Sequence, residues 1–242
     1  MSVGSYRQFC PVAMAAEVLC GRWTLLLVRE LMLGSSRFND LRRGVPRMSS
    51  ALLAKRLKEL EAAGIVARAP ASHPADPHEY RLTPAGLELR PIVESMGVWG
   101  RRWVTTEATL RHLDANLLMW DIRRNVRAEP APLARTTIEF IFSDRAPPEH
   151  TYWLVVERGH EADLCLLDPG FDVDLYVSTD LRTLTEVWLG YSDWSRAMGS
   201  GALRLTGTSE LAARLRAWLP GSAFAAVGRA GARREGRVGP ER

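Results

Sequence analysis

The 242-residue sequence lacks several features that would assign a protein to a class at once. It has no run of about 18 apolar residues, so no membrane-spanning helix is predicted. Its first residues, MSVGSYRQF, lack the apolar stretch and cleavage site of an export signal, so we expect a cytoplasmic location. Its three cysteines, Cys10, Cys20 and Cys165, form no CxxC pair and cannot all be bridged, which fits a reducing compartment.

Motifs of catalysis and metal binding are also missing. The sequence has no GxSxG, P-loop, HExxH or dinucleotide-binding fingerprint, so no catalytic residue is predicted and an enzyme is not expected. Asp172 and Asp174 share one face of a predicted strand, and His73 and His78 share a loop, but neither pair has a third ligand nearby. We therefore expect no metal and no cofactor.

Charge is distributed unevenly along the chain. Residues 1–105 carry 15 Lys/Arg against 9 Asp/Glu, and residues 106–228 carry 12 against 17. A basic first part is what a surface that contacts phosphates requires. We expect one domain at 1–105, a second domain at 106–228, and a disordered Gly/Arg-rich tail at 229–242 whose cations add weak attraction to DNA.

The stretch from Arg37 to Arg81 follows the order helix, turn, helix, strand, polar loop, strand, which predicts a winged helix. A short helix with Phe38 and Leu41 turned inward is followed by the turn Gly44-Val45-Pro46. The later elements are the helix Met48–Gly64, the strands Ile65–Arg68 and Glu79–Leu82, and the wing tip Ala69–His78 between them. Such a module places its second helix in a DNA groove.

On Met48–Gly64, helical spacing puts Leu53, Leu57 and Leu60 on one side and small or basic residues on the other. Small side chains allow close approach to base edges, and cations neutralise phosphates. An ordinary solvated helix face is the alternative. The candidate DNA-binding residues are Arg37, Arg43, Arg47, Ser49, Ser50, Ala54, Lys55, Arg56, Lys58, His73 and Arg81.

Two further helices flank this module. Trp23–Leu33 is expected to bury one stripe that includes Leu26, Leu27 and Glu30, and Gly34-Ser35-Ser36 is expected to end it and to cap the next helix. A single helix is expected from Thr83-Pro84 to Val104. Its narrow apolar seam suits a partner helix, so we expect a homodimer, with packing on its own domain as the alternative. The seam consists of Leu89, Ile92, Met96, Trp99 and Trp103.

Several short motifs occur in order along residues 10–103. They are Cys10-Pro11, Gly21-Arg22-Trp23-Thr24, Arg37-Phe38-Asn39-Asp40-Leu41, Ser49-Ser50, Leu57 to Gly64 and Tyr80 to Gly86. In this order they resemble the HxlR family of bacterial winged-helix regulators, in the MarR-like superfamily. The resemblance implies a dimeric, sequence-specific transcription factor, often a repressor. Some relatives sense oxidants through a cysteine at the position of Cys10, which is therefore a possible redox residue, with an inert thiol as the alternative.

The second half of the chain predicts an α+β domain. After a helix at His112–Arg127, with Leu113, Leu117 and Trp120 in one row, a series of strands reads as an antiparallel meander covered by helices. Those strands are Thr136–Phe142, Tyr152–Glu157, Ala162–Leu167 and Asp172–Ser178. A helix capped by Thr179, a short helix at Tyr191–Met198, a strand at Ala202–Thr206 and a helix at Ser209–Leu219 complete the prediction.

The motifs DPGFDVD (Asp168–Asp174), VWLG (Val187–Gly190) and LTG (Leu205–Gly207) give this half a resemblance to the sterol-carrier-protein fold over about residues 108–225. The resemblance implies an apolar tunnel between sheet and helices that holds a hydrophobic molecule. The candidate ligand-pocket residues are Trp120, Phe140, Phe142, Trp153, Leu184, Trp188 and Trp194.

Together these patterns indicate a dimeric regulator that binds operator DNA and is controlled by a hydrophobic effector. Two alternatives are open: a redox-sensing regulator that acts through Cys10 with the second domain as scaffold, and a carrier of hydrophobic ligands. The operator, the effector and the sign of regulation are not encoded in any pattern that we find.

Overall fold

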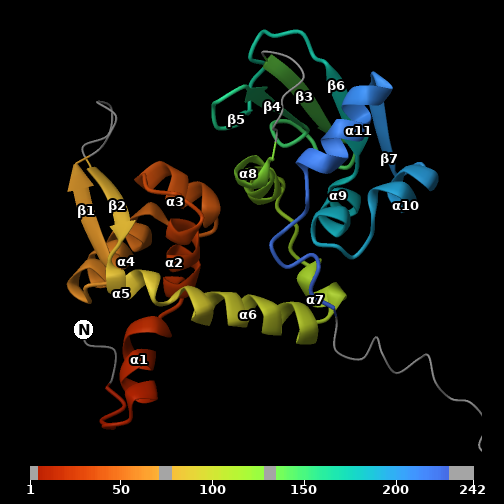
Figure 1. Cartoon of the computed structure of the whole chain (residues 1–242). Coiled ribbons are helices and arrows are strands. Elements are labelled where there is room, and N and C mark those ends of the chain that lie inside the picture. The colour runs from red at the N-terminus through yellow and green to blue at the C-terminus, as the bar shows by residue number, and fades with distance from the viewer. Residues whose placement is uncertain (1–4, 71–77, 128–134, 229–242) are drawn as a thin grey trace, which may run out of the picture. The chain divides into compact units, whose positions relative to one another are not determined.

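The computed structural model of the protein describes residues 5–70, 78–127 and 135–228. These residues form two compact units, Met1–Met96 and Gly97–Arg242, with the division inside one helix (Figure 1). His73, most of the predicted wing tip and the predicted basic tail at 229–242 lie outside the described residues. Each unit is considered by itself below.

The N-terminal unit is a set of helices with one β-hairpin (Figure 1). The hairpin is antiparallel, with Val66 opposite Leu82 and Pro70 opposite His78. The predicted order of helix, turn, helix, strand and strand is confirmed. Its elements are α1 (Pro11–Leu19), α2 (Thr24–Met32), α3 (Phe38–Gly44), α4 (Ser50–Ala62), β1 (Val66–Pro70), β2 (His78–Leu82), α5 (Pro84–Leu87) and the first part of α6 (Arg90–Trp103).

Leucines from three helices pack together in the core of this unit. Leu27 of α2, Leu41 of α3 and Leu53 and Leu57 of α4 are all fully buried. The stripe predicted on α2 is wrong at Leu26, which is 40% exposed. The predicted burial of Leu27 and Glu30 is confirmed, and Thr24 and Val28 are buried with them.

The ends of these helices follow the chemistry of their first residues. Ser49 caps α4, where its hydroxyl accepts a hydrogen bond from the N–H of Leu52 at 3.3 Å, and Thr83 caps α5 in the same way. The serine cap predicted for α3 is wrong, since Arg37 occupies the N-cap position and its side chain does not cap the helix.

The helix predicted from Thr83 to Val104 is two helices, α5 and α6, separated at Glu88 and Leu89. Pro91 explains the break, because it has no N–H to donate to the carbonyl of Leu87 and its ring would crowd that carbonyl. Among the described residues no single helix is long and apolar enough to cross a membrane. Only α1 and α2 together, bent by 81°, reach that length and composition.

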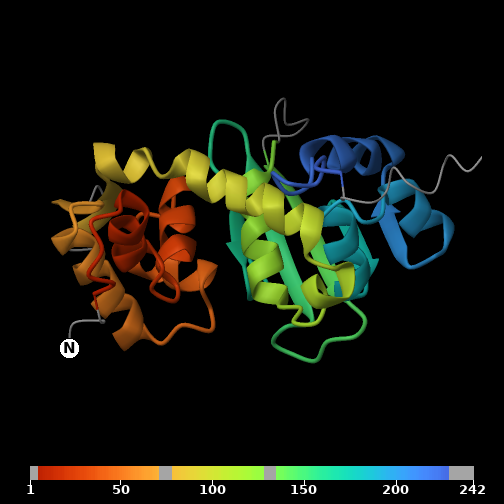
Figure 2. The same ribbon diagram turned by 90° about the horizontal axis from the view of Figure 1, so that it is seen from below.

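The C-terminal unit is α+β, with one five-stranded sheet in the order β5-β4-β3-β6-β7. Helices and sheet pack in layers (Figures 1 and 2). Its elements are the end of α6, α7 (Thr106–Thr109), α8 (Ala115–Asn125), β3 (Arg135–Phe142), β4 (Thr151–Glu157), β5 (Asp163–Cys165), β6 (Leu175–Thr179), α9 (Leu181–Trp188), α10 (Trp194–Gly199), β7 (Leu203–Gly207) and α11 (Ser209–Trp218).

The predicted antiparallel meander is wrong at β6. The strands β3, β4 and β5 are antiparallel neighbours, but β6 returns to the other side of β3 and pairs with it in parallel. Asp174 fixes this arrangement, because its N–H donates to the carbonyl oxygen of Thr137 and its carboxylate accepts from the N–H of Thr137, both at 2.9 Å. Turn residues predict where a strand ends, but they do not predict which strands pair with each other.

The core of this unit lies on one face of the sheet. Ile138, Phe140 and Phe142 of β3 point toward helices α8, α9 and α11 and are fully buried. Of the row predicted on α8, Trp120 is buried outside this core, and Leu113, which precedes the helix, packs at the edge of the core. The residues that enter this core are Ala115, Leu118, Met119 and Ile122. The cap of α9 is Asp180 rather than Thr179, with the N–H of Thr183 at 2.8 Å.

Candidate nucleic-acid interface

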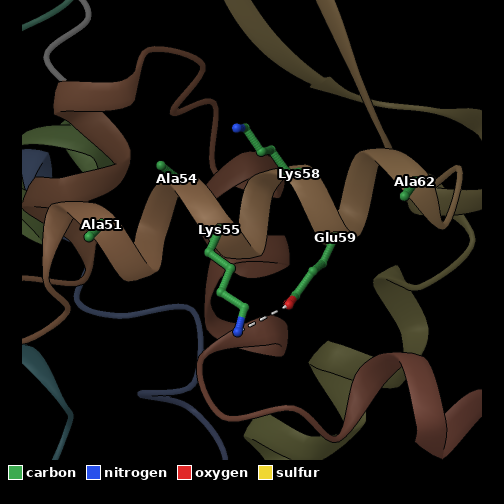
Figure 3. Close-up of a pocket in the computed structure, with 6 residues that line it drawn as sticks. All are labelled: Ala51, Ala54, Lys55, Lys58, Glu59 and Ala62. Atoms are coloured by element: carbon green, nitrogen blue, oxygen red, sulfur yellow. Dashed lines mark ion pairs between the residues drawn. The ribbon is translucent and has the colours of Figure 1, made fainter. Parts of the chain in front are cut away.

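The outer face of α4 combines small and basic side chains. Figure 3 shows Lys55 and Lys58 pointing to opposite sides of this face. The side chain of Lys55 is 69% exposed, and its Nζ lies 3.9 Å from Oε1 of Glu59. Among the described residues no carboxylate pairs with Lys58. The residues that line the open hollow along this face are Ala51, Ala54, Lys55, Lys58, Glu59 and Ala62 (Figure 3).

The opposite side of α4 fixes the direction of this face. Leu53 and Leu57 are fully buried and Leu60 is 2% exposed. Turning the helix about its axis would expose these leucines, at a cost of about 2 kcal/mol for each. The alanines and lysines are therefore held toward solvent by packing on the other side of the same helix.

A buried ion pair supports the turn that leads into α4. Glu30 is fully buried, and its Oε1 accepts from Nη2 of Arg29 at 2.6 Å. Arg29 also donates to the carbonyl oxygen of Gly44, at 3.3 Å. A Cβ on Gly44 would meet Oε2 of Glu30 at 1.8 Å, so only glycine fits there. Sequence reasoning missed this pair, although a charged residue inside an apolar stripe is a usable signal.

Other predicted DNA-binding residues surround the turn before α4. Arg47 and Ser50 are exposed, and among the described residues Arg47 has no ion-pair partner. Arg43 is exposed and its Nη1 lies 3.4 Å from Oδ1 of Asp40, while Arg37 is half-buried at the start of α3. The hydroxyl of Ser49 serves as the cap described above.

Arg56 lies apart from the outer face. Its side chain is 21% exposed and its Nη1 is 2.5 Å from Oε2 of Glu59. A Cβ on Gly21 would be 3.1 Å from that same nitrogen, so the guanidinium packs against the chain before α2. The structure therefore brings together Ala54, Lys55 and Lys58 and separates Arg56 from them.

The base of the wing carries two more arginines. Arg68 lies over the ring of Tyr80, with its Cζ 5.7 Å from the ring centroid, and donates to the Tyr80 hydroxyl at 3.4 Å. That hydrogen bond raises the pKa of Arg68 further, so its charge is permanent. Arg81 is exposed, and its Nη2 lies 3.1 Å from Oε2 of Glu79, which is buried.

Cys10 precedes α1 and is fully exposed, as a sensing thiol requires. The backbone N–H groups of Ala13 and Val12 point toward its sulfur and lower the pKa of the Cys10 thiol. A lower pKa increases the thiolate fraction, which is the form that reacts with oxidants. Cys20, which follows the other end of α1, is also exposed.

The predicted pocket residues of the C-terminal unit fall into separate places. Phe140, Phe142, Leu184 and Trp188 lie in the core on the helix side of the sheet, with Trp194 packed at its edge. The indole N–H of Trp188 donates to Oδ2 of Asp121 at 2.7 Å and so ties α9 to α8.

Two of the predicted pocket residues are not part of that core. Trp120 is buried on another side of α8, beneath the guanidinium groups of Arg123 and Arg124. Trp153 lies on the opposite face of the sheet, because side chains alternate along β4 and Tyr152 and Leu154 take the core side. A pocket that includes all of the predicted residues is therefore excluded.

Comparisons with known proteins match the N-terminal part of the chain. A family model described as HxlR-like helix-turn-helix matches residues 18–108. The uncharacterized HTH-type transcriptional regulator YvaP of Bacillus subtilis (strain 168) is 36% identical over 98 residues, which are 40% of this chain and 91% of that protein. YybR of the same organism is 40% identical over 95 residues, 39% of this chain and 75% of that protein.

Among solved structures, the redox regulator HypR in its oxidized form is 40% identical, with a TM-score of 0.35, and the match covers 38% of this chain and 94% of that one. The helix-turn-helix and the relatives define a transcriptional regulator with a DNA-binding module. The chain belongs to the HxlR-like helix-turn-helix family.

Proposed function

We propose that the protein is a cytoplasmic, dimeric repressor that binds a specific operator through α4 and responds to a hydrophobic effector in its C-terminal unit. The observation that carries the DNA claim is the outer face of α4, where three alanines flank two oppositely directed lysines (Figure 3). The B-DNA major groove is about 12 Å wide and admits one helix with small side chains at its contact face.

The two kinds of side chain on α4 have different tasks. Lys55 and Lys58 reach to either side and can each neutralise a phosphate. The alanines let the helix approach base edges, where Ser50 and Arg47 supply hydrogen bonds. Arg81, at the base of the wing, is placed on an exposed strand face from which it can contact the flanking backbone.

Exposed apolar residues on two helices of the N-terminal unit support a dimer. On α6, Ile92 is 46% and Met96 is 52% exposed, and α6 buries no residue fully. On α1, Val12 is 76% and Met14 is 54% exposed. A second copy of the chain would cover both sets, and two-fold readers of this kind bind paired half-sites about one helical turn apart.

Contacts within the C-terminal unit support coupling of an effector to the dimer helix. The later part of α6 is bound by residues that follow α9 and α11. Arg101 donates to the carbonyl oxygen of Gly190 at 3.2 Å and lies over the ring of Tyr191, 4.2 Å from its centroid. A Cβ placed on Gly97 would lie 2.1 Å from Cζ of Phe224, so the ring packs against the backbone of α6. A ligand that shifts α9 would therefore act on α6 directly.

An electrophoretic mobility shift with the promoter region of its own gene tests the DNA claim. The double variant Lys55→Ala/Lys58→Ala should weaken binding at least tenfold and reduce the slope of log K against log salt by about two, since two phosphate contacts are lost. The control is Arg90→Ala, whose exposed side chain pairs with Glu94 on α6. Equal losses in both proteins, or no sequence-selective complex at all, would contradict the proposal.

A second candidate function is redox sensing through Cys10, and the lowered pKa of its thiol favours it. Peroxide would oxidise the thiolate to a sulfenic acid with release of hydroxide. The nine-residue helix between Cys10 and Cys20 spans about 14 Å, so these two thiols cannot form a disulfide within one chain. If Cys10→Ser leaves peroxide-induced release from DNA unchanged, this candidate is excluded.

A further inference from the structure

The face of the C-terminal sheet that points away from its core carries one continuous row of side chains. Glu139 is opposite Trp153 on one side and opposite Tyr176 on the other. Cys165 and Thr206 extend the row to the two edge strands. Residues directly opposite each other in a sheet share a face, and none of these five belongs to the core on the other face.

A carboxylate lies at the centre of this row, between two aromatic rings. The side chain of Trp153 hydrogen-bonds Glu139, and since an indole can only donate, its N–H orients the carboxylate. Asp168, on the connection between β5 and β6, lies near enough for its charge to act on Glu139. Burial of Glu139, followed by the charge of Asp168, raises the pKa of this carboxyl, against the opposing effects of Trp153 and His150.

Apolar residues on this face and on the β5–β6 connection are open to solvent. Tyr176 is 38% exposed, and on the β5–β6 connection Leu166 is 51%, Leu167 is 82% and Phe171 is 39% exposed. Phe171 carries the guanidinium of Arg135 over its ring, 3.8 Å from the centroid, and so already holds one cation. An exposed apolar patch that contains a carboxylate among aromatic residues is typical of a binding site.

We propose that this face, centred on Glu139 with Trp153 and Tyr176 beside it, binds an organic cation: an amine or ammonium group on an aromatic or aliphatic body. The carboxylates of Glu139 and Asp168 attract the cationic group, the rings of Trp153 and Tyr176 add attraction through their π faces, and the apolar residues cover the body. The net negative charge of residues 106–228, with 12 Lys/Arg against 17 Asp/Glu, favours approach of a cation over an anion.

This site goes beyond the proposed function, because all of its residues belong to the C-terminal unit and its binding is measured without DNA. It also differs from the predicted hydrophobic pocket, which would lie on the helix side of the sheet. Failure to bind DNA would therefore leave this proposal standing, and the reverse holds as well.

The test is isothermal titration calorimetry of the full chain with three probes of one shape: 1-naphthylmethylammonium, 1-naphthalenemethanol and 1-naphthylacetate. The ammonium probe should bind with a dissociation constant on the order of 0.1 mM and the other two at least tenfold more weakly. Glu139→Gln should weaken the ammonium probe about tenfold and leave the alcohol unchanged. Tyr176→Ala should weaken both the ammonium and the alcohol, because it removes a wall rather than a charge.

The matched control is Glu210→Gln on α11, a 70% exposed carboxylate on an element that packs on the core side of the sheet. It should bind all three probes as the unchanged protein does, and thermal melts should show every variant folded. Equal affinity for the three probes, binding insensitive to Glu139→Gln, or no binding at 10 mM would each overturn the assignment. A further result would also overturn it: the protein binds no amine but associates with itself, and Leu167→Asp abolishes that association. A second copy of the chain would then be the occupant of this face.

Discussion

The two units present outward surfaces of opposite character. In the N-terminal unit, α4 turns Lys55 and Lys58 outward beside alanines. In the C-terminal unit, the open face of the sheet turns Glu139 outward between aromatic rings. The first surface suits a long anionic polymer, because its cations are spread along a helix and its small side chains permit close approach. The second suits a small cation, because a carboxylate lies between two aromatic residues.

Each unit also contains a glycine that a side chain from another element approaches closely. At Gly44 the approaching group is the buried carboxylate of Glu30, and at Gly97 it is the ring of Phe224. The first contact lies at the helix-turn-helix and the second lies between α6 and the end of the C-terminal unit. Substitution of each glycine should therefore disturb one unit and spare the other.

The largest effect is expected for Gly44→Ala. Its Cβ would lie 1.8 Å from Oε2 of Glu30, which is held by Arg29 and cannot move without breaking a buried ion pair. We expect the N-terminal unit to lose about 3 kcal/mol of stability and DNA binding to be lost with it. Hydrogen exchange read by mass spectrometry should show faster exchange in α2, α3 and α4 and unchanged exchange in β3 and β4. Unchanged protection in α3 would show that the turn tolerates a side chain.

Smaller changes in stability, of opposite sign, are expected for the substitution of two glycines on α6. Gly97→Ala should destabilise the contact with Phe224 by about 2 kcal/mol, because the ring must leave its place. Gly100→Ala meets nothing within 4 Å and should stabilise the helix by about 0.5–1 kcal/mol. The two variants are controls for each other in chemical denaturation followed by circular dichroism.

Removal of the ring tests the cause assigned to Gly97. In a Phe224→Ala background, Gly97→Ala should cost nothing or stabilise the protein, as Gly100→Ala does. If Gly97→Ala costs the same with and without Phe224, the close contact at 2.1 Å does not explain the destabilisation.

The sequence predicted the N-terminal unit well because its signals are local. Ser49 caps α4, Thr83 and Pro84 start α5, and Leu53 and Leu57 repeat at helical spacing within one element. The errors in this unit came from tertiary contacts and from proline. The carboxylate of Glu30 enters the core only because Arg29 and the missing side chain of Gly44 accept it.

The C-terminal unit was harder to predict because its decisive contacts are distant in sequence. The strands were located within a few residues, but the parallel pairing of β6 with β3 depends on Asp174 reaching Thr137. The same misplaced strand hid the open face, since Glu139 and Tyr176 are neighbours only in the observed order. Trp153 was assigned to the wrong face of the sheet, and its partner Glu139 was not among the predicted site residues.

A moderate effect is expected at the start of α4. Ser49→Ala removes the hydroxyl that accepts from the N–H of Leu52 and should cost the N-terminal unit about 1 kcal/mol. Ser50→Ala, one residue on, removes an exposed hydroxyl that caps nothing and should leave stability within about 0.5 kcal/mol. In electrophoretic mobility shifts, Ser50→Ala should reduce the preference for the operator sequence more than Ser49→Ala does. Equal effects on stability would mean that the cap contributes nothing.

The smallest effect is a pH dependence confined to the C-terminal unit. The raised pKa of Glu139 means that this carboxyl takes up its proton at a higher pH than an ordinary glutamate does. Binding of 1-naphthylmethylammonium should therefore be complete above that raised pKa and should weaken as pH falls through it, since a neutral carboxyl offers the cation no charge. DNA affinity depends on Lys55 and Lys58 of the other unit and should not follow the same curve.

His150, directly before β4, and Asp168, on the β5–β6 connection, act on Glu139, and Tyr176 faces it from β6. Because these groups also act on Glu139, calorimetry across pH is compared between the unchanged protein and Glu139→Gln. The part of the pH dependence that Glu139→Gln removes belongs to Glu139. Should the variant keep the whole dependence, Glu139 would not be the centre of the site.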